Sequence, residues 1–395
     1  MRILTFLHSF ELGGVERIAL RLVRSWRENG ADAPLFMGRV DGPMRGELAD
    51  GLSYEVPRQP LFGTARWETI WMIATMPRTI RRLRPDLLFC AGNSYTVIAV
   101  AMRLMLGRRC PPIVAKISND LDRPDMPWAV RKLYRVWLWV QGRFIDHFVG
   151  MEEPMRGEIA DRIGPPSGAI TIIPDPALTL AQIDRLRATS PSPLRSGPGR
   201  RFVAIGRLAR QKNFPLMVKA FAEGRQSHDH LTIYGDGPER PALERLAARL
   251  KMDAFVHFMG HVPDPASRLP EHDIFLLSSD YEGVPAVLLE ALAADRAIIA
   301  THCSRSIATL LNDGTLGQLI PVGDRAAFAQ AIAEADGARR DSSTSLKQVC
   351  RFSIEHAASA YLACFATVEK SRSGATAALA SPCRHGSGTT VQSRT

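Results

Sequence analysis

Two glutamates flank the start of a predicted helix and could hold a polyhydroxylated ligand. An apolar run, Ile274–Leu277, is typical of a buried strand, and the Ala- and Leu-rich segment 286–294 is typical of a helix. Between them lies the turn Glu282-Gly283-Val284-Pro285, with Pro285 expected at the first helical position, where no N–H is needed. Glu290 follows, more than one turn inside the helix.

A helix start presents free N–H groups and the positive end of the helix dipole, so it suits a phosphate or diphosphate. Carboxylates beside such a site accept hydrogen bonds from hydroxyl groups, as the acidic residue of a dinucleotide fold does with ribose. Glu282 and Glu290 therefore indicate a ligand with two polyol ends and a charged centre, the form of a nucleotide sugar. The alternative is that Glu290 is a solvated helix residue and Glu282 a turn residue favoured by the dipole.

Two cations in the second half of the chain could bind the same diphosphate. The strand Phe202–Ile205 is followed by Gly206, then Arg207 and Lys212. Arg can bind phosphate oxygens with a two-point fork, and Lys acts as a point charge. The alternative, two solvated surface cations, is less consistent with their position after a strand and a glycine.

Glycine-containing turns follow several predicted strands. Gly13-Gly14 lies between the strand Ile3–Leu7 and a helix at about 15–29, and Gly235 and Gly237 follow the strand Leu231–Tyr234. A glycine-rich turn that opens a helix is typical of phosphate-binding loops, although glycines are common in any tight turn.

Polar residues Ser118, Asn119 and Asp120 follow the predicted strand Ile113–Ile117. Asn119 can donate a hydrogen bond to a sugar hydroxyl but cannot transfer protons. Asp120-Leu121-Asp122 matches a three-residue metal-binding pattern, but nothing else in the sequence supports a metal. We therefore interpret Asn119 and Asp120 as the rim of an acceptor or sugar site and expect no metal and no cofactor.

The predicted strands alternate with helices along the chain. Further strands are expected at 86–90, 147–149, 170–176 and 255–259, and a last strand with its turn at 317–324. Alternation of this kind predicts an α/β fold with parallel sheets covered by helices on both faces, and ligands at the carboxyl ends of the strands. The chain is long enough for two domains, and the stretch 190–200, rich in Ser, Pro and Gly, is expected to link them.

Composition indicates an ordinary globular protein with anionic partners. Of the 395 residues 46% are hydrophobic and 23% charged, and the net charge is +10. Six scattered cysteines, without a CxxC pair, signal neither a disulfide framework nor a zinc site. The N-terminal segment is predicted as a strand and not as a signal peptide, and no apolar stretch is long enough to span a bilayer.

Two basic and aromatic stretches, 66–84 and 128–144, contain five of the six tryptophans. Trp beside Arg and Lys suits an anionic membrane surface. The alternative is core packing, with Val130, Leu133, Trp137, Val140 and Phe144 forming an inward stripe. Leu138 and Trp139 fall outside that stripe, which favours docking to a membrane. Nucleic acid is not expected, because the cations share their faces with bulky apolar residues.

The segment E-G-V-P-A-V-L-L-E resembles the paired-glutamate signature of the retaining GT-B glycosyltransferases of family 4, and G-R-L-x-x-x-K from Gly206 to Lys212 resembles a second family motif. The resemblance extends over about 1–370. It implies two Rossmann-like domains facing each other across a deep cleft: an acceptor domain (1–178), a linker (179–200), a nucleotide-sugar donor domain (201–352), a helix crossing back to the first domain (353–370) and a disordered tail (371–395).

The resemblance also implies roles for individual residues. Glu282 would contact the transferred sugar, with Arg207 and Lys212 stabilising the departing diphosphate as the other catalytic residues. Glu290 would contact the ribose. The remaining donor-binding residues would be Gly13, Gly14, Gly206, Gly235, Gly237, His261, Val262, Gly283, Val284 and Pro285, with the loop containing His261 and Val262 lining the nucleobase pocket.

This sequence departs from the family at two places. Asn119 stands near the position where many members have a His close to the reacting sugar, and Ser304-Arg305-Ser306 and Thr309 replace a Gly-Gly or Gly-Pro pair and a following Glu. Because of these departures, the sugar preference of other family members is not carried over to this chain.

The predicted activity is transfer of a sugar, with retention, from a UDP- or GDP-sugar to the hydroxyl of a glycan or a lipid-linked acceptor, in the assembly of lipopolysaccharide, another cell-surface polysaccharide or a glycolipid. We expect a cytoplasmic protein, either free or peripheral on the cytosolic face of a membrane. Two alternatives remain: a nucleotide-sugar epimerase or hydrolase on the same scaffold, and a non-catalytic membrane-associated relative.

Overall fold

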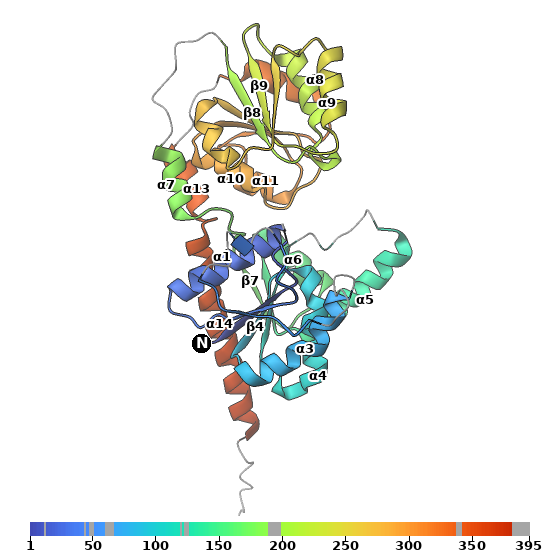
Figure 1. The fold of residues 1–395 in the computed structure, drawn as a ribbon, viewed down its shortest axis with the longest axis vertical. Coiled ribbons are helices and arrows are strands. Elements are labelled where there is room, and N and C mark those ends of the chain that lie inside the picture. The colour runs from blue at the N-terminus through green and yellow to red at the C-terminus, as the bar shows by residue number, and fades with distance from the viewer. Residues whose placement is uncertain are drawn as a thin grey trace, which may run out of the picture.

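The computed structural model describes residues 1–11, 13–42, 45–46, 51–59, 67–118, 121, 126–188, 199–336 and 342–380, with the backbone alone for residues 305 and 373–380. It has two α/β domains, one above the other in Figure 1. Each contains a parallel sheet with helices on both faces, which confirms the predicted fold class.

The first domain contains a seven-stranded sheet in the order β3-β2-β1-β4-β5-β6-β7. Its strands are β1 (Ile3–Leu7), β2 (Leu35–Met37), β3 (Tyr54–Glu55), β4 (Leu87–Cys90), β5 (Ile113–Lys116), β6 (His147–Gly150) and β7 (Ile170–Ile172). Its helices are α1 (Gly14–Glu28), α3 (Glu68–Leu83), α4 (Thr96–Leu106), α5 (Trp128–Phe144) and α6 (Glu153–Arg162), with short 3₁₀ turns η1 (Asn93–Tyr95) and η2 (Gly107–Arg109).

The second domain contains a six-stranded sheet in the order β10-β9-β8-β11-β12-β13. Its strands are β8 (Arg201–Ile205), β9 (His230–Tyr234), β10 (Val256–Gly260), β11 (Ile274–Leu277), β12 (Ala297–Thr301) and β13 (Gln318–Ile320). Its helices are α7 (Leu180–Ala188), α8 (Phe214–Gly224), α9 (Arg240–Arg249), α10 (Ala286–Ala293), α11 (Arg305–Leu310), α12 (Arg325–Glu334) and α13 (Ser342–Cys350), with 3₁₀ segments η3 (Arg210–Lys212) and η4 (Pro265–Glu271).

The two faces of the second sheet have separate cores. Phe202 and Phe221 belong to the core under α8, α9 and α12, whereas Phe275, Leu288 and Leu292 belong to the core under α10, α11 and α13. α7 lies within residues 179–200, and Ile183 and Leu186 of this helix pack into the second of these cores. Residues 180–188 therefore form part of the second domain.

The last helix, α14 (Ile354–Ala380), returns to the first domain and runs alongside α1 (Figure 1). Trp26 of α1 packs edge-on against Phe89, Tyr361 and Phe365, with ring centroids 5.2–5.9 Å apart. Its Nε1–H donates to the carbonyl oxygen of Ala358 at 3.2 Å. This aromatic cluster makes α14 part of the first domain's core. The helix continues to Ala380, so residues 371–380, which were predicted to begin a disordered tail, belong to α14. Residues 381–395 lie outside the described residues.

Candidate active site

Both sheets have one place where the strand order reverses, and in the second sheet it lies between β8 and β11. The chain leaves β8 toward β9 on one side and β11 toward β12 on the other. In open α/β sheets, ligands bind outside the carboxyl ends of the strands at such a reversal. The predicted catalytic residues Arg207, Lys212 and Glu282 all belong to the loops that follow β8 and β11.

Lys212 and Glu282 form an ion pair across this reversal. The side chains are 21% and 10% exposed, so the pair is largely shielded from water. Ser279 also donates its Oγ–H to Oε1 of Glu282 at 2.7 Å, and Ser278 donates to the carbonyl oxygen of Lys212 at 2.9 Å. The predicted diphosphate cation and sugar carboxylate therefore lie in direct contact.

Further hydrogen bonds join the two loops. The N–H of Asp280 donates to the carbonyl oxygen of Gln211 at 2.9 Å, and Nε2 of Gln211 donates to the carbonyl oxygen of Tyr281 at 3.0 Å. Nδ2 of Asn213 donates to Oδ1 of Asp280 at 2.7 Å. Because backbone and side chain both take part, the position of Lys212 relative to Glu282 is set by the loops as well as by the ion pair.

Arg207 is exposed at the carboxyl end of β8. Within the described part of the chain its guanidinium makes no hydrogen bond or ion pair. The structure thus places Arg207 on the same loop as Lys212 without joining it to the Lys212–Glu282 pair.

Glycines after β8 and β9 allow the two loops to pack backbone against backbone. Gly235 has φ +141°, and a Cβ added there would lie 1.9 Å from the carbonyl oxygen of Gly206. A Cβ on Gly237 would lie 2.4 Å from the carbonyl oxygen of Leu208. The close packing of the two loops therefore explains glycine at positions 235 and 237 without a bound phosphate.

The turn after Glu282 is held from the loop after β12. Ser304 and Ser306 both donate to the carbonyl oxygen of Gly283, at 3.2 and 2.8 Å. Pro285 was predicted at the first helical position but is the N-cap, so α10 begins one residue later at Ala286, and Val284 packs on the core under this helix. The serines that depart from the family pattern thus fix the turn that carries Glu282.

Glu290 lies on α10 and is influenced by charges from the first domain. Burial and the charge of Asp264 raise the pKa of its carboxyl to about 7, against the opposite effect of Arg21 and Arg17 of α1. Its carboxyl makes no hydrogen bond within the described residues. The structure therefore places Glu290 where α10 faces α1, separate from the Lys212–Glu282 pair.

The loop after β10 contains the residues expected near a nucleobase. His261 is exposed, and Val262 is partly buried against the core under α10. Asp264, whose charge acts on Glu290, belongs to the same loop. The loop that contains Val262 therefore packs near α10, the helix that contains Glu290.

The first sheet reverses between β1 and β4, and a polar cluster lies at that point. Tyr95 donates its hydroxyl to Oε1 of Glu16 at 2.5 Å and accepts from the backbone N–H of His8 at 3.3 Å, while its ring lies 4.7 Å from that of His8. Oγ1 of Thr69 lies 3.3 Å from Nε2 of His8. Burial lowers the pKa of His8 against the charges of Glu68 and Glu16, so neutral imidazole is favoured.

The two glycines at the start of α1 lie close to Glu16 in the chain. Gly13 is the N-cap of α1, and a Cβ there would lie 1.9 Å from Oε2 of Glu16, whereas a Cβ on Gly14 would meet nothing within 4 Å. Gly13 therefore leaves space for Glu16 to bend back toward Tyr95.

The predicted rim residues Asn119 and Asp120 lie outside the described residues. Their neighbour Ser118 is described, and its N–H donates to Oδ1 of Asn93 at 2.9 Å. Within the described ranges, no group of three or more His, Cys, Asp or Glu side chains could hold a metal ion. No helix in that part of the chain is both long and apolar enough to cross a membrane.

Two family models match the chain in succession. Residues 12–176 match the model described as Glycosyltransferase Family 4, and residues 199–335 match the model described as Glycosyl transferases group 1. The chain belongs to the family 4 (group 1) glycosyltransferases. The family models therefore confirm the resemblance carried by the segment from Glu282 to Glu290.

Curated relatives match this chain over shorter stretches. The lipopolysaccharide core biosynthesis glycosyltransferase LpsE of Rhizobium meliloti is 32% identical over 130 residues, which are 33% of this chain and 37% of LpsE. The alpha-D-kanosaminyltransferase of Streptomyces kanamyceticus is 34% identical over 133 residues, 32% of this chain and 34% of that protein. The chain therefore spans about a third of the length of these relatives.

Solved structures show that the chain has the GT-B fold. The apo lipopolysaccharide outer core galactosyltransferase WaaB superposes with a TM-score of 0.71 at 17% identity, covering 91% of this chain and 98% of WaaB. A glycosyltransferase from Rickettsia africae gives a TM-score of 0.72 at 14% identity, covering 93% and 98%. At these identities the similarity establishes the fold alone.

Proposed function

We propose that this protein transfers a sugar from a nucleoside diphosphate sugar, UDP- or GDP-linked, to an acceptor hydroxyl with retention at the anomeric carbon. The observation that carries the proposal is the Lys212–Glu282 pair at the strand reversal of the second sheet, directly before the start of α10. It brings together a cation for a diphosphate, a carboxylate for sugar hydroxyls and the N–H groups of a helix start.

The chemical difficulty is the negative charge that grows on the diphosphate as the glycosidic bond breaks. Lys212, Arg207 and the N–H groups near residues 284–286 can stabilise this charge, and such preorganised donors act most strongly where water is excluded. In this mechanism a diphosphate oxygen replaces Glu282 as the partner of Lys212. The scheme uses no metal, and a departing phosphate oxygen can accept the proton of the acceptor hydroxyl.

Glu282, released from Lys212, would accept hydrogen bonds from sugar hydroxyls and orient the ring. Ser279 still donates to its Oε1, and the serine contacts to Gly283 hold the turn. Glu290 would accept from the ribose, beside the loop with His261 and Val262. A double-displacement mechanism would need a second carboxylate on the opposite side of the anomeric carbon from Glu282. Among the described residues, no other carboxylate has support for such a role comparable to that of Glu282.

The acceptor is proposed to enter from the first domain, against His8 and Glu16, which the buried Tyr95 holds through its hydroxyl. These groups lie at the carboxyl edge of the first sheet, where its strand order reverses. A neutral imidazole and a carboxylate suit hydroxyl groups better than phosphates. The names of LpsE and of a WcaL protein of Salmonella typhimurium, described as a putative colanic acid biosynthesis glycosyltransferase, support an acceptor belonging to a cell-surface glycan.

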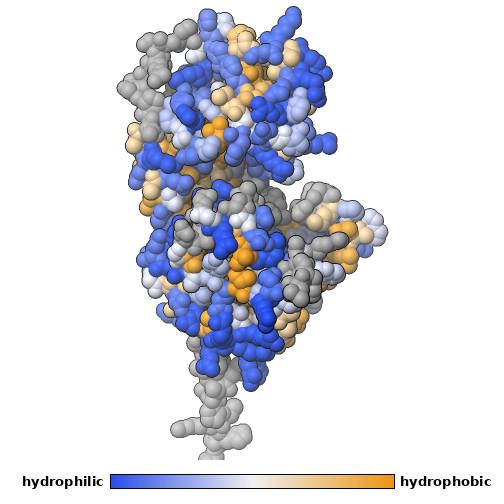
Figure 2. Space-filling view, viewed as in Figure 1, coloured by the Kyte–Doolittle hydropathy of each residue, from blue (hydrophilic) through white to orange (hydrophobic). Residues whose placement is uncertain are grey.

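We further propose that α5 docks the enzyme on an anionic membrane from the cytoplasmic side. Leu133, Trp128 and Trp139 are 72%, 69% and 60% exposed, and Nζ of Lys132 lies 5.3 Å from the Trp128 ring centroid. α5 has four basic and no acidic residues. It projects from the side of the first domain (Figure 1), and apolar surface is visible there in Figure 2. Exposed Trp beside cations is typical of a membrane interface.

The structure supports the sequence argument for α5 only in part. In the alternative of core packing, Val130 and Leu133 would face inward, but they are 48% and 72% exposed. Leu138, which was counted with Trp139 in favour of docking, is 1% exposed. Trp137, Val140 and Phe144 do pack on the core. Only the second half of α5 therefore rests on the domain, which leaves the first half exposed.

The first test is a thermal-shift screen with UDP-glucose, UDP-galactose, UDP-N-acetylglucosamine, GDP-mannose and ADP-glucose, because a ligand that binds only the folded state raises its melting temperature. The sugar nucleotide that binds is then incubated with and without an alkyl glycoside, and nucleotide release and product stereochemistry are measured by NMR. Release that requires the acceptor and an unchanged anomeric configuration support the proposal. Donor consumption unaffected by acceptor indicates an epimerase or hydrolase instead, and no stabilisation by any sugar nucleotide indicates a non-catalytic relative.

A further inference from the structure

A basic hollow lies at the amino edge of the first sheet, opposite the edge that carries His8 and Tyr95. Its volume is about 480 Å³, within the range of small-molecule sites. It is lined by the end of α3, the end of α4 and the segments that lead into β4 and β5, namely Ile80, Arg81, Arg84, Pro85, Met105, Leu106, Arg109 and Pro111. None of these residues has a role in the proposed transfer.

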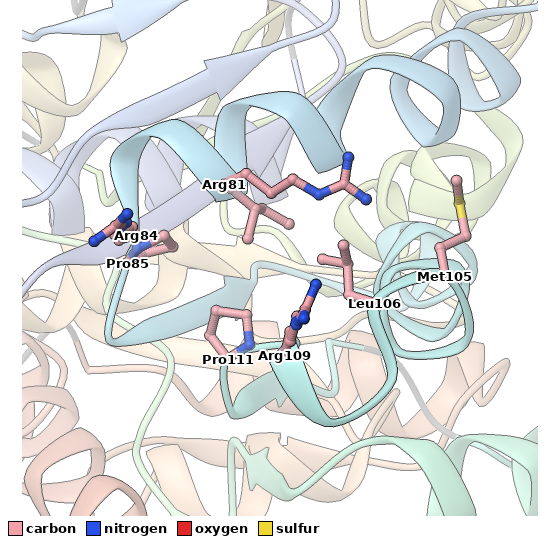
Figure 3. A pocket seen from close by; sticks show the side chains of 8 residues that line it. Arg81, Arg84, Pro85, Met105, Leu106, Arg109 and Pro111 are labelled. Carbon is pink, nitrogen blue, oxygen red and sulfur yellow. The ribbon is translucent and has the colours of Figure 1, made fainter.

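Arginines from different elements share this hollow. Figure 3 shows Arg81 of α3 and Arg109 of η2 extending into the space between their elements, with Arg84 at one end. In the described part of the chain these three guanidinium groups make no hydrogen bond or ion pair, and no carboxylate lines the hollow. Arg372 of α14 adds a fourth cation at this edge, donating to the carbonyl oxygen of Arg108 at 3.2 Å.

Helix-end electrostatics alone do not account for this arrangement. A cation in the last turn of a helix interacts favourably with the helix dipole, and this applies to Arg81. It does not require cations from separate elements to share one hollow, where they repel one another. Arg84 also has a φ of +47°, in the left-handed region, which is unfavourable for residues other than glycine and asparagine.

We propose that this hollow binds a phosphate group that carries an apolar substituent. Guanidinium forks match phosphate oxygens, and a phosphate has enough acceptor oxygens for more than one arginine. The volume exceeds what a phosphate alone requires, and Ile80, Leu106 and Met105 supply apolar surface beside the cations. The same chemistry is presented by a lipid phosphate headgroup and by a soluble phosphate ester.

The helices that line the hollow, α3 and α4, and the helix α5 of the same domain carry exposed apolar side chains. Of the fifteen large hydrophobic side chains exposed among the described residues, ten lie on α3, α4 or α5 or directly before α3. Leu104 and Met105, 62% and 53% exposed, belong to the end of α4 beside the arginines. A phosphate in the hollow would thus lie next to apolar surface that lipid chains could contact.

The test compares two charge-matched double variants, each losing two arginines. Arg81→Gln/Arg109→Gln removes the facing cations of the hollow, and Arg245→Gln/Arg249→Gln removes two exposed arginines of α9 in the second domain. Arg84→Gly is a third variant, expected to keep the fold because glycine suits the left-handed position. The assignment is independent of the proposed transferase activity, so sugar transfer is not a readout.

One arm titrates inorganic phosphate by calorimetry, with Lys212→Ala in every protein to weaken binding at the donor site. The other measures cosedimentation with phosphatidylcholine vesicles containing phosphatidic acid or, at equal charge, phosphatidylglycerol. Arg81→Gln/Arg109→Gln should weaken phosphate binding at least about tenfold, as expected for losing a charge-assisted contact, or abolish the preference for phosphatidic acid. Arg84→Gly should have the same effect more weakly, and the α9 variant should have none.

The outcomes separate the two sources of phosphate. Loss in the calorimetric arm alone assigns the hollow to a soluble phosphate, and loss of the headgroup preference alone assigns it to a lipid. If Arg81→Gln/Arg109→Gln behaves like the α9 variant in both arms, including the case where neither probe binds, the assignment is overturned.

Discussion

The two domains share one strand topology but present different chemistry where their strand order reverses. In the second domain the reversal carries Lys212 and Glu282, with glycines at 206, 235 and 237 that bring the loops together. In the first domain it carries His8, Tyr95 and Glu16, with no lysine–carboxylate pair among the described residues at that point. The comparison shows that a common scaffold can present a lysine–glutamate ion pair at one reversal and a His–Tyr–Glu cluster at the other.

The difference also concerns how each site is held. The Lys212–Glu282 pair is supported by backbone and side-chain hydrogen bonds between loops, including Asp280 to Gln211 and Ser278 to Lys212. The first-domain cluster is centred on the hydroxyl of Tyr95, which contacts both Glu16 and His8. Substitutions in the second domain should therefore affect the donor step, and those in the first domain should affect acceptor recognition.

The largest effect is expected for Glu282→Ala. Turnover should fall by about 10³-fold or more, because the sugar loses its orienting carboxylate. Nucleotide binding, measured by thermal shift, should be retained, since Lys212 loses its protein partner and stays available to the diphosphate. Glu244→Ala, at an exposed position of α9, is the control. Substantial turnover by Glu282→Ala would refute the assigned role.

Lys212→Ala should lower kcat/KM by about 10²- to 10³-fold, the scale for removing one donor that stabilises developing charge. The nearby Arg210 is exposed on η3, and its side chain makes no hydrogen bond or ion pair among the described residues, so Arg210→Ala should leave kcat/KM within about threefold. Steady-state kinetics over a range of donor concentrations provide the measurement. A loss below about tenfold for Lys212→Ala would remove the lysine from the mechanism.

His8→Ala and Tyr95→Phe should raise the acceptor KM by about tenfold, the equivalent of one neutral hydrogen bond, and leave the donor KM unchanged. The melting temperature of each variant controls for loss of structure around Glu16. If the donor KM changes and the acceptor KM does not, the proposed division of labour between the two reversals is wrong.

The smallest effect is expected for the pH dependence of nucleotide binding. Burial raises the pKa of Glu290 from 4.5 to about 7, so the carboxyl becomes protonated as pH falls through 7 and loses acceptor capacity toward ribose. Nucleotide affinity should fall a few-fold between pH 8 and 6. Glu290→Gln should flatten this dependence in a calorimetric titration, and an unaltered profile in that variant would exclude Glu290 as its origin.

The same shift has a defined sign for folding. Because the pKa of Glu290 is higher in the folded chain, ionisation opposes folding from about pH 4.5 upward and reaches its full effect above about pH 7. Glu290→Gln should therefore unfold at a higher temperature than the parent at pH 8 and show no gain at pH 4, as measured by thermal denaturation without nucleotide.

The regular elements of the fold could be predicted from apolar runs and turn residues. The predicted strands Ile3–Leu7 and Ile274–Leu277 agree with β1 and β11, because each is a continuous buried run followed by polar residues. β2 and β3 have only three and two residues, too few to give a periodic signal, and were not predicted. α7 was not predicted either, since the adjoining Pro- and Ser-rich stretch suggested a linker.

The site could be predicted only in part. Lys212 and Glu282 were identified singly, by their places after a strand, but their pairing depends on β8 and β11 being neighbours. His8 carried a usable signal, because it directly follows the first strand. Tyr95 carried none, since its contact with His8 requires β4 to lie beside β1. Tertiary neighbours of this kind are not encoded in local spacing.

The chain passes between the domains twice, and the two passages are bonded to each other. Ala177 donates its N–H to Phe352 at 3.0 Å, and Ile354 donates to Leu178 at 2.8 Å, so Leu178 and Ser353 lie side by side in parallel. Arg21 of α1 donates to the carbonyl oxygen of Ala177 at 3.2 Å. A single bridge between two adjacent segments fixes the distance between them and leaves rotation as the movement it restrains least. Any movement of one domain relative to the other should therefore be a rotation about this joint, which would change the distance of Glu290 from Arg17 and Arg21.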